Sequence, residues 1–262
     1  MERTLGNLIF ELNKKNASIE DISKNLTDLE EVLGGICMQM YKEDRSNRIC
    51  LNMPETPLKD LFDGYQFKKD EKPGPYTGEW EVPNKEEGNS FGDFVKLQDS
   101  FKFNLAQQLI ALIERLTGGN LSSDEIKPLG KLKEKLILVT IELLIASLAI
   151  HPSSRQLFAS TRYMAIIASL FQFEILIAPI IALLPYIIAN NSDSIRSFEK
   201  EVLKFTCDLL LKDVDKECQL AILELLLVYL TPEENVTTEE KRQLLEEYLD
   251  SDFTKQLVDR GI

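Results

Sequence analysis

The sequence predicts an all-α protein, built as an armadillo- or HEAT-like stack of helical repeats (an α-α superhelix). The first observation is a helix-terminating phrase that recurs every forty residues, beginning at His151, Asn191 and Thr231. The first two copies also agree in detail, because Ser154 aligns with Ser194 and Phe158 with Phe198. A period near forty residues is typical of arrays in which each helical unit packs only on its neighbours.

The second observation is that each copy of the phrase follows a long apolar run. These runs are Leu136–Ile150, Ile175–Ala189 and Leu220–Leu230. A helix that is hydrophobic on all sides has to be surrounded by other helices. We therefore expect these three segments to line the interior of one stack that extends over a single domain, residues 1–262.

The N-terminal region predicts two helices. The first spans Thr4–Lys14 and places its apolar side chains on one face, at Leu5, Leu8, Ile9 and Leu12. The second begins near Ser18, where an acid three residues later completes a capping pattern, and it runs to about Met40. The pair Gly34-Gly35 lies inside it and indicates a place where another helix approaches closely.

Residues 43–90 differ from the rest, with five prolines, four glycines and many charges. A structureless stretch of this length is unusual inside a compact domain, so we expect a flexible or irregular insert. Its aromatic residues could dock on the stack itself or on a partner; they are Phe62, Tyr65, Phe67, Tyr76 and Trp80. Thr56 precedes Pro57, which leaves phosphorylation of Thr56 as an open question.

From residue 91 onward the pattern is helical throughout. We expect one helix over Phe94–Thr117, which Gly118 and Gly119 end. The expected interior helices are Lys131–Ile150, Ile175–Ala189 and Gln219–Leu230. The segments Arg162–Phe171 and Phe198–Leu211 are the expected companion helices. The charged, amphipathic segment Thr238–Asp259 is a candidate for the cap, since the last repeat of an array needs a polar outer face.

The charge balance narrows the range of partners. The chain has 30 basic and 43 acidic side chains, and a formal net charge of −13. Such a surface repels phosphate backbones and anionic membranes, so we expect neither a nucleic-acid partner nor membrane affinity. The uncharged part of Tyr163–Ala189, Ile175 to Ile188, is shorter than the roughly 20 residues that a membrane span requires. A buried helix is the interpretation that we favour there.

The cysteines Cys37, Cys50, Cys207 and Cys218 form no C-x-x-C pair, and the only histidine, His151, lies apart from them. This spacing argues against a zinc site and against a disulfide framework. Reduced thiols are typical of cytosolic and nuclear proteins. Cys37 and Cys207 fall in apolar helical segments, so we expect them in the core.

Few residues could support catalysis. His151 is the only residue around which a Ser-His or Cys-His pair could form, and it stands at a helix end directly before Pro152. No phosphate-binding glycine loop is present. The sequence thus predicts a protein that is not an enzyme, with no catalytic residue, cofactor, metal or small-molecule substrate.

Two arginines are candidates for partner binding, Arg155 and Arg196, at related positions of the recurring phrase. Either could bind an acidic side chain of a partner. The structural alternative is that each donates to orphan carbonyl groups at the end of the preceding helix. The sequence does not identify the partner-binding face further.

Four stretches of the chain resemble one fungal family. They are Leu26–Cys37, Lys96–Leu116, Ile141–Phe158 (ending H-P-S-S-R-Q-L-F) and Leu220–Glu233 (ending L-L-V-Y-L-T-P-E). The family is the non-phosphatase cell division control protein fourteen of the septation initiation network. The resemblance implies a non-catalytic binding subunit of a STE20-type (germinal-centre) protein kinase, which acts at the spindle pole body to promote septum formation and cytokinesis.

Two alternatives remain open at this point. A generic armadillo-like adaptor would have the same fold and would bind another protein cargo. An unrecognised hydrolase would need His151, and the absence of a second histidine argues against it. We expect a cytoplasmic protein that also localises to the spindle pole body, the latter implied by the resemblance alone.

Overall fold

The computed structural model describes residues 5–14, 16–43, 91–98, 104–118, 129–189, 191, 200–212, 214–230, and 255, 256 and 259. All regular structure within these residues is helical, which confirms the all-α prediction. The α-helices are α1 (Leu5–Leu12), α2 (Ile19–Glu43), α4 (Phe91–Gln98), α5 (Leu105–Thr117), α6 (Lys131–Ile150), α7 (Thr161–Ser169), α8 (Ile177–Ile188), α10 (Lys200–Leu210) and α11 (Lys216–Leu230). Short 3-10 helices are η2 (Pro152–Ala159), η3 (Leu170–Gln172) and η4 (Glu174–Leu176).

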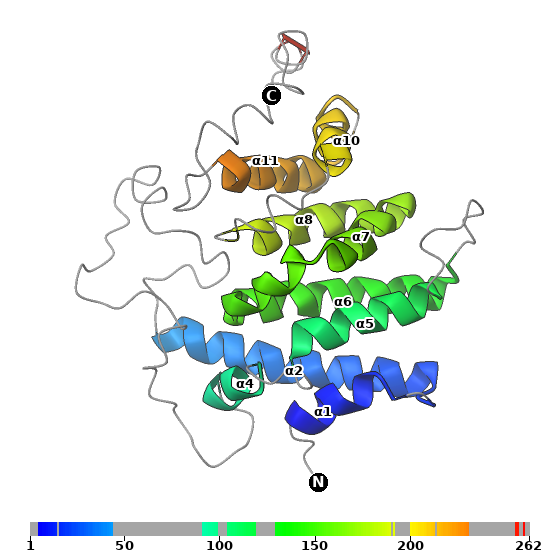
Figure 1. The fold of residues 1–262 in the computed structure, drawn as a ribbon, viewed down its shortest axis with the longest axis vertical. Coiled ribbons are helices and arrows are strands. Elements are labelled where there is room, and N and C mark those ends of the chain that lie inside the picture. Colours follow the sequence, from blue (N-terminus) through cyan, green and yellow to red (C-terminus); the bar gives the residue numbers. More distant parts are fainter. Residues whose placement is uncertain are drawn as a thin grey trace.

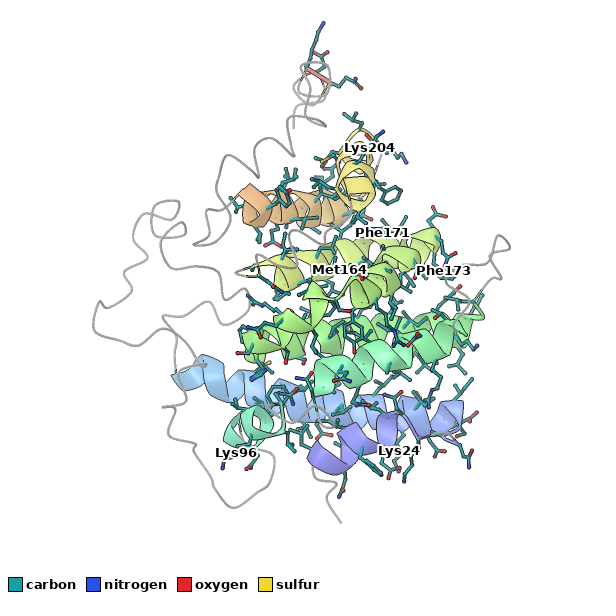
Figure 2. All side chains as sticks on the ribbon, viewed as in Figure 1. Lys24, Lys96, Met164, Phe171, Phe173 and Lys204 are labelled. Atoms are coloured by element: carbon teal, nitrogen blue, oxygen red, sulfur yellow. The ribbon has the colours of Figure 1, made fainter. Side chains whose placement is uncertain are left out.

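The helices form successive layers that follow the order of the chain (Figure 1). Helices α2, α6, α8 and α11 form one row, in which α6 contacts both α2 and α8, and α8 also contacts α11. Helices α1, α5 and α10 pack on the members α2, α6 and α11 of this row. Side chains fill the space between the layers (Figure 2). The layers fit the predicted stack, while their assignment to the armadillo or HEAT class stays a prediction.

Helices α1 and α2 form as the sequence predicts. The buried residues of α1 are the four that share the predicted face, Leu5, Leu8, Ile9 and Leu12. At the start of α2 the Ser18 backbone N–H donates to Asp21 Oδ2 at 3.1 Å, and the Asp21 N–H donates to Ser18 Oγ at 3.1 Å. This reciprocal pair satisfies two backbone donors that the helix itself leaves free.

The expectation of close helix approach at Gly34 and Gly35 is wrong. Both glycines are exposed, and no atom lies within 4 Å of the position that a Cβ would take. Leu33 and Ile36, which flank them in sequence, are the buried residues of this turn. The two glycines thus lie on the solvent side of α2, where a helix neighbour is not needed.

The segment Phe94–Thr117, predicted as one helix, contains two. Helix α4 ends at Gln98 and α5 begins at Leu105, because Asn104 takes the N-cap position and its Oδ1 accepts from the Gln107 N–H at 3.1 Å. The break escaped prediction because apolar residues keep the helical spacing across it. The predicted stop is confirmed, since Gly118 adopts φ 79°, in the left-handed region.

Helix α6 has the predicted bounds, Lys131–Ile150, and contacts α2, α5 and α8. The chain bends by 115° between α6 and η2. His151 stands at this bend, and its N–H donates to Ser147 O at 2.9 Å. The proline after it starts η2, as expected for a residue that has no N–H to donate to a continuing helix.

The prediction that the apolar helices lie in the interior of the stack is confirmed for α6 and α8. For α11 it is wrong in part. Most of α6 after its first turn is buried, as are Ile180, Leu184 and Ile187 of α8. In α11, however, Leu220 is 62% and Leu223 is 44% exposed. The reason is that α11 is the last helix of the described row, so its far side has no described neighbour.

Several predictions concern residues outside the described part of the chain. They include the insert from residue 44 to 90, with Thr56 and Cys50, and the partner-binding candidate Arg196. Of the expected cap, only Lys255, Gln256 and Asp259 are described, and all three are helical and exposed.

Candidate functional site: a buried polar junction and an open apolar face

The recurring phrase at His151 lies at the centre of a buried polar junction. We use this name for six buried polar residues: Gln98, Asn104, His151, Ser154, Arg155 and Asn191. Their side chains join the entry of α5, the bend after α6 and the end of α8.

Ser154 is the point where α5 meets η2. Its Oγ accepts a hydrogen bond from Asn104 Nδ2 at 2.9 Å and lies 2.9 Å from His151 Nδ1. Asn104 Nδ2 also donates to Gln98 O at 3.0 Å, and Gln98 Oε1 accepts from the Leu105 N–H at 2.7 Å. One hydroxyl group therefore connects segments that are 50 residues apart in the chain.

Arg155 makes the second connection of the junction, toward α8. Its Nη1 donates to Ala189 O at 2.9 Å, and Asn191 Nδ2 donates to Arg155 O at 2.6 Å. Ala189 is the C-cap of α8, so the guanidinium satisfies a carbonyl that the helix leaves free.

The position of Arg155 corrects the partner-binding hypothesis. The residue is only 2% exposed, so its side chain is not on a surface that a partner could reach. The structural alternative fits, with one change. The acceptor is Ala189 O at the end of α8, 34 residues after Arg155, and not a carbonyl of the preceding helix.

The pair His151–Ser154 has the spacing of a nucleophile and its base, but not the access. His151 is 8% and Ser154 is 3% exposed, and the serine hydroxyl already accepts from Asn104. A substrate would have to displace the packing between α5 and η2 to reach this hydroxyl. The junction thus serves to hold three helices in register.

Sequence reasoning identified Ser154 and Arg155 in this junction but missed Gln98 and Asn104. The available signal was Asn104 itself, since asparagine is a preferred N-cap residue before an apolar periodic segment. Asn191 was recognised as the start of a repeated phrase, and its hydrogen bond to Arg155 O was not predictable from that.

Two tests for other kinds of site can be made on the described residues. Within the ranges given above, no group of three or more His, Cys, Asp or Glu side chains could hold a metal ion. In the same part of the chain no single helix is long and apolar enough to cross a membrane. The bent pair α6–η2 passes that test by length and composition only.

The solvent side of α8 is an open apolar face. The helix and the turn before it place Ile175, Ala178, Ala182 and Tyr186 along one side at helical spacing. Ile175 is 53% exposed and the other three are half-buried. We call these residues the open α8 face, although its half-buried members also pack in part against the core. Helix α8 as a whole contacts α11, α6, η2, η3 and η4.

The neighbouring helix α6 has a similar exposed side. Leu138 and Ile145 are half-buried there, one turn before and after the exposed Glu142. Partly exposed apolar side chains beside a charged one are typical of protein interaction sites.

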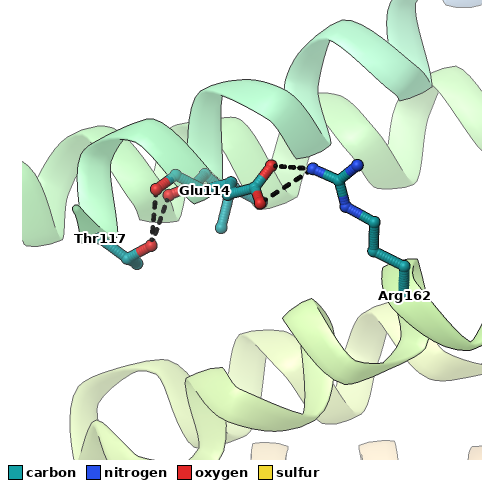
Figure 3. Close-up of polar contacts among 4 residues, drawn as sticks. Glu114, Thr117 and Arg162 are labelled. Carbon is teal, nitrogen blue, oxygen red and sulfur yellow. Dashed lines mark hydrogen bonds and ion pairs between the residues drawn. The ribbon is translucent and has the colours of Figure 1, made fainter. Parts of the chain in front are cut away.

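Helices α5 and α7, which we call the companion side of the stack, are linked by a charged contact. Arg162 of α7 donates through Nη2 to both carboxylate oxygens of Glu114 in α5, each at 3.0 Å (Figure 3). The Arg162 side chain is 69% exposed. Thr117 Oγ1 in the same figure lies 3.0 Å from the carbonyl oxygens of Ile113 and Glu114, to which it donates within α5. A charged contact of this kind links the two helices α5 and α7.

The thiols of Cys207 and Cys218 are buried, and their pKa values are raised. Burial, with a smaller effect of Asp208, raises the pKa of Cys207 to about 11. Burial also raises the pKa of Cys218, and Asp215 adds to this. Cys207 is in the core as predicted, while Cys37 is only half-buried. Protonated thiols are poor nucleophiles, so neither buried cysteine is suited to catalysis.

Together these features define a class: a layered all-α protein whose buried polar residues maintain its fold and whose open face is apolar. The comparison with family models identifies the family. The model of the cell division control protein 14 family, described as a SIN component, matches residues 1–256. The chain therefore belongs to this family of the septation initiation network, as the resemblance implied. Neither the comparison with curated proteins nor that with solved structures gave a significant match.

Proposed function

We propose that this protein is the non-catalytic binding subunit of a STE20-type (germinal-centre) protein kinase in septation initiation. In this role it promotes septum formation and cytokinesis. The observation that carries the proposal is the family match over residues 1–256, because the family is a component of the septation initiation network. Binding of the kinase stabilises, localises or activates it.

The architecture supports a binding role. A row of four helices with companion helices packed on it is what an armadillo- or HEAT-like array requires, and we assign the fold to that class. Arrays of this kind present an extended surface to other proteins.

The absence of catalytic activity is supported by how the polar residues are used. His151, Ser154 and Arg155 each bond to another part of the fold and are at most 8% exposed. The family description names a network component and no enzymatic reaction.

The open α8 face is the surface that we assign to the kinase, through a region outside its catalytic domain. The exposed Ile175 and the half-buried Tyr186 supply apolar area that a partner can bury. The acidic charge of the chain favours a partner with basic residues around its apolar core. The same charge supports our expectation that nucleic acid is not a partner.

We place the complex in the cytoplasm and at the spindle pole body.

Co-purification of the two proteins from defined components tests the proposal. Ala182→Arg puts a long charged side chain in the middle of the open α8 face and should weaken kinase binding at least about tenfold, a loss near 1.4 kcal/mol. Ala165→Arg is the matched control, because Ala165 is an exposed alanine of α7 on the companion side. It should bind like the wild type.

Three outcomes would contradict parts of the proposal. A kinase that neither binds nor changes its activity would refute the kinase partnership. Binding that Ala182→Arg leaves intact would refute the face. Recovery of a different cargo from mitotic cells by pull-down and mass spectrometry, without the kinase, would favour the generic adaptor.

A further inference from the structure

One side of α11 exposes two leucines. Leu220 is 62% and Leu223 is 44% exposed, whereas Ile222 and Leu225, on the other side of the helix, are buried. Helix α11 packs mainly on α8 and is the last member of the described row in Figure 1. Two large apolar side chains that are exposed one turn apart on a well-packed helix indicate a contact surface.

Two opposite charges flank Leu220 on the same side of α11. Lys216 lies four residues before it and Glu224 four residues after it, and both are exposed. Residues four apart lie on one face of a helix, and each charge is about 6 Å along the helix axis from Leu220. The three residues therefore form a row that is positive, apolar and negative in turn.

This row is complementary to itself. When two copies of a helix meet antiparallel across a two-fold axis, a residue before the axis lies level with the residue at the same distance after the axis in the other copy. With the axis at Leu220, Lys216 of each copy lies level with Glu224 of the other copy. The two Leu220 side chains meet between these charges, so one surface supplies both halves of the contact.

The charge of the row favours a second copy over a basic partner. The chain has a net charge of −13, so two copies repel each other over most of their surfaces. Salt at physiological strength screens this repulsion beyond about 8 Å, whereas opposite charges in contact stay attractive. The row has one positive and one negative residue and is neutral, while a basic partner would be expected to bind an acidic surface.

We propose that α11 binds α11 of a second copy of this chain in an antiparallel contact, with Leu220 at the two-fold axis. Lys216 pairs with Glu224 of the other copy, and the contact covers Leu220 and Leu223. One helix from each copy buries less than the about 800 Å² per partner of a standard interface, so the dimer is weak, with a Kd in the micromolar range. The open α8 face lies on a different helix and stays outside the contact.

Exchange of the two charges tests the contact in the full chain without any kinase. Lys216→Glu and Glu224→Lys each place like charges level with each other at both ends of the contact, and each should weaken self-association at least about tenfold. Mixed in equal amounts, the two variants again place opposite charges at both ends. The mixture should therefore dimerise where neither variant does so alone. Sedimentation equilibrium over the micromolar range of concentration measures all three samples.

Lys24→Glu and Glu31→Lys are the matched controls. They make the same changes of charge at exposed positions of α2, the first helix of the row. Each should dimerise like the wild type, and their mixture should gain nothing over either variant alone. All four variants change exposed residues and should keep the wild-type thermal midpoint, so that a lost dimer is not the result of unfolding.

A cysteine at the axis gives a second measurement. A two-fold contact centred on Leu220 places this residue next to the same residue of the other copy. Leu220→Cys should therefore link two chains under mild oxidation, and mass spectrometry should identify a peptide joined through position 220 of both. Ile175→Cys is the control, because Ile175 is an apolar residue of similar exposure on α8, and it should link more slowly.

A wild-type chain that stays monomeric throughout the micromolar range would overturn the proposal, and would assign the leucines to a contact within the chain or with another protein. A mixture of the two charge variants that dimerises no better than either alone would overturn the pairing. No experiment contains the kinase, so their failure would leave the proposed function standing, and failure of kinase binding would leave the dimer standing.

Discussion

Helices α6 and α11 have almost the same character in sequence and different positions in the stack. Both are apolar nearly all round, with Glu142 and Glu224 as isolated charges in their second halves. Helix α6 contacts α2, α5 and α8 and buries Leu144 completely. Helix α11 has only α8 and α10 as principal described neighbours, and Leu220 stays 62% exposed.

The difference shows that an apolar helix is not by itself an interior helix. Its sequence demands neighbours on all sides. The place of the helix in the array decides which neighbours it has. They can come from the described stack, from the end of the chain or from another protein. The interior of the stack and its C-terminal end should therefore respond differently to the same change, which the following predictions measure.

The largest effect is expected from Leu144→Asp in the interior. An unpaired buried charge should cost several kcal/mol and unfold the domain. Leu220→Asp in α11 is the matched change, and it should cost no more than about 2 kcal/mol, since its carboxylate can stay in contact with water. Thermal and urea unfolding measure both. Equal losses would remove the distinction between the two helices, and a stable Leu144→Asp variant would contradict the placement of α6.

A smaller effect is expected from Arg155→Met in the polar junction. The change keeps most of the side-chain volume but leaves Ala189 O without the guanidinium donor at 2.9 Å. The loss should be about 1–3 kcal/mol in the free energy of unfolding. Arg155→Lys should not restore it, because a single ammonium group lacks the planar fork. Wild-type stability of Arg155→Met would show that the junction does not hold η2 to α8.

Alkaline pH should weaken the C-terminal layer through Cys207. Its pKa is raised from 9.0 to about 11 in the folded state, first by burial and then by Asp208. The folded state therefore keeps its thiol proton where the unfolded state loses it. This stabilisation is complete below pH 9 and is lost as pH rises through 11, a change of at most about 2–3 kcal/mol. Unfolding of Cys207→Ala, followed over the same range, should show a flatter pH dependence; an unchanged slope would contradict the assignment to Cys207.

The smallest effect is expected from Arg162→Met on the companion side. The ion pair with Glu114 is largely exposed, so its loss should cost about 0–1 kcal/mol, and less at high salt. Urea unfolding at low and high ionic strength measures it. Comparison with Arg155→Met then separates a buried arginine from an exposed one in the same fold, and equal losses would mean that burial is not what distinguishes them.

Much of the fold followed from local patterns in the sequence. The apolar face of α1, the capping pair Ser18–Asp21, the bounds of α6 and the stop at Gly118 were all predicted, because each depends on residues within a few positions of one another. The break between α4 and α5 was not predicted, because apolar residues keep the helical spacing across it and hide the N-cap signal of Asn104. The further hydrogen bond from Asn104 to Ser154, 50 residues away, could not be predicted from local patterns.

For the candidate site, too, some features followed from the sequence and others only from the tertiary structure. The sequence by itself determined the helical class and the limits of most helices, and its motifs indicated the family that the family comparison then confirmed. Only the tertiary structure decided that Arg155 is buried, that α8 has an open apolar side and that Leu220 is uncovered. The physical reason is that helix formation depends on neighbours along the chain, whereas the burial of a side chain depends on which distant segments pack against it.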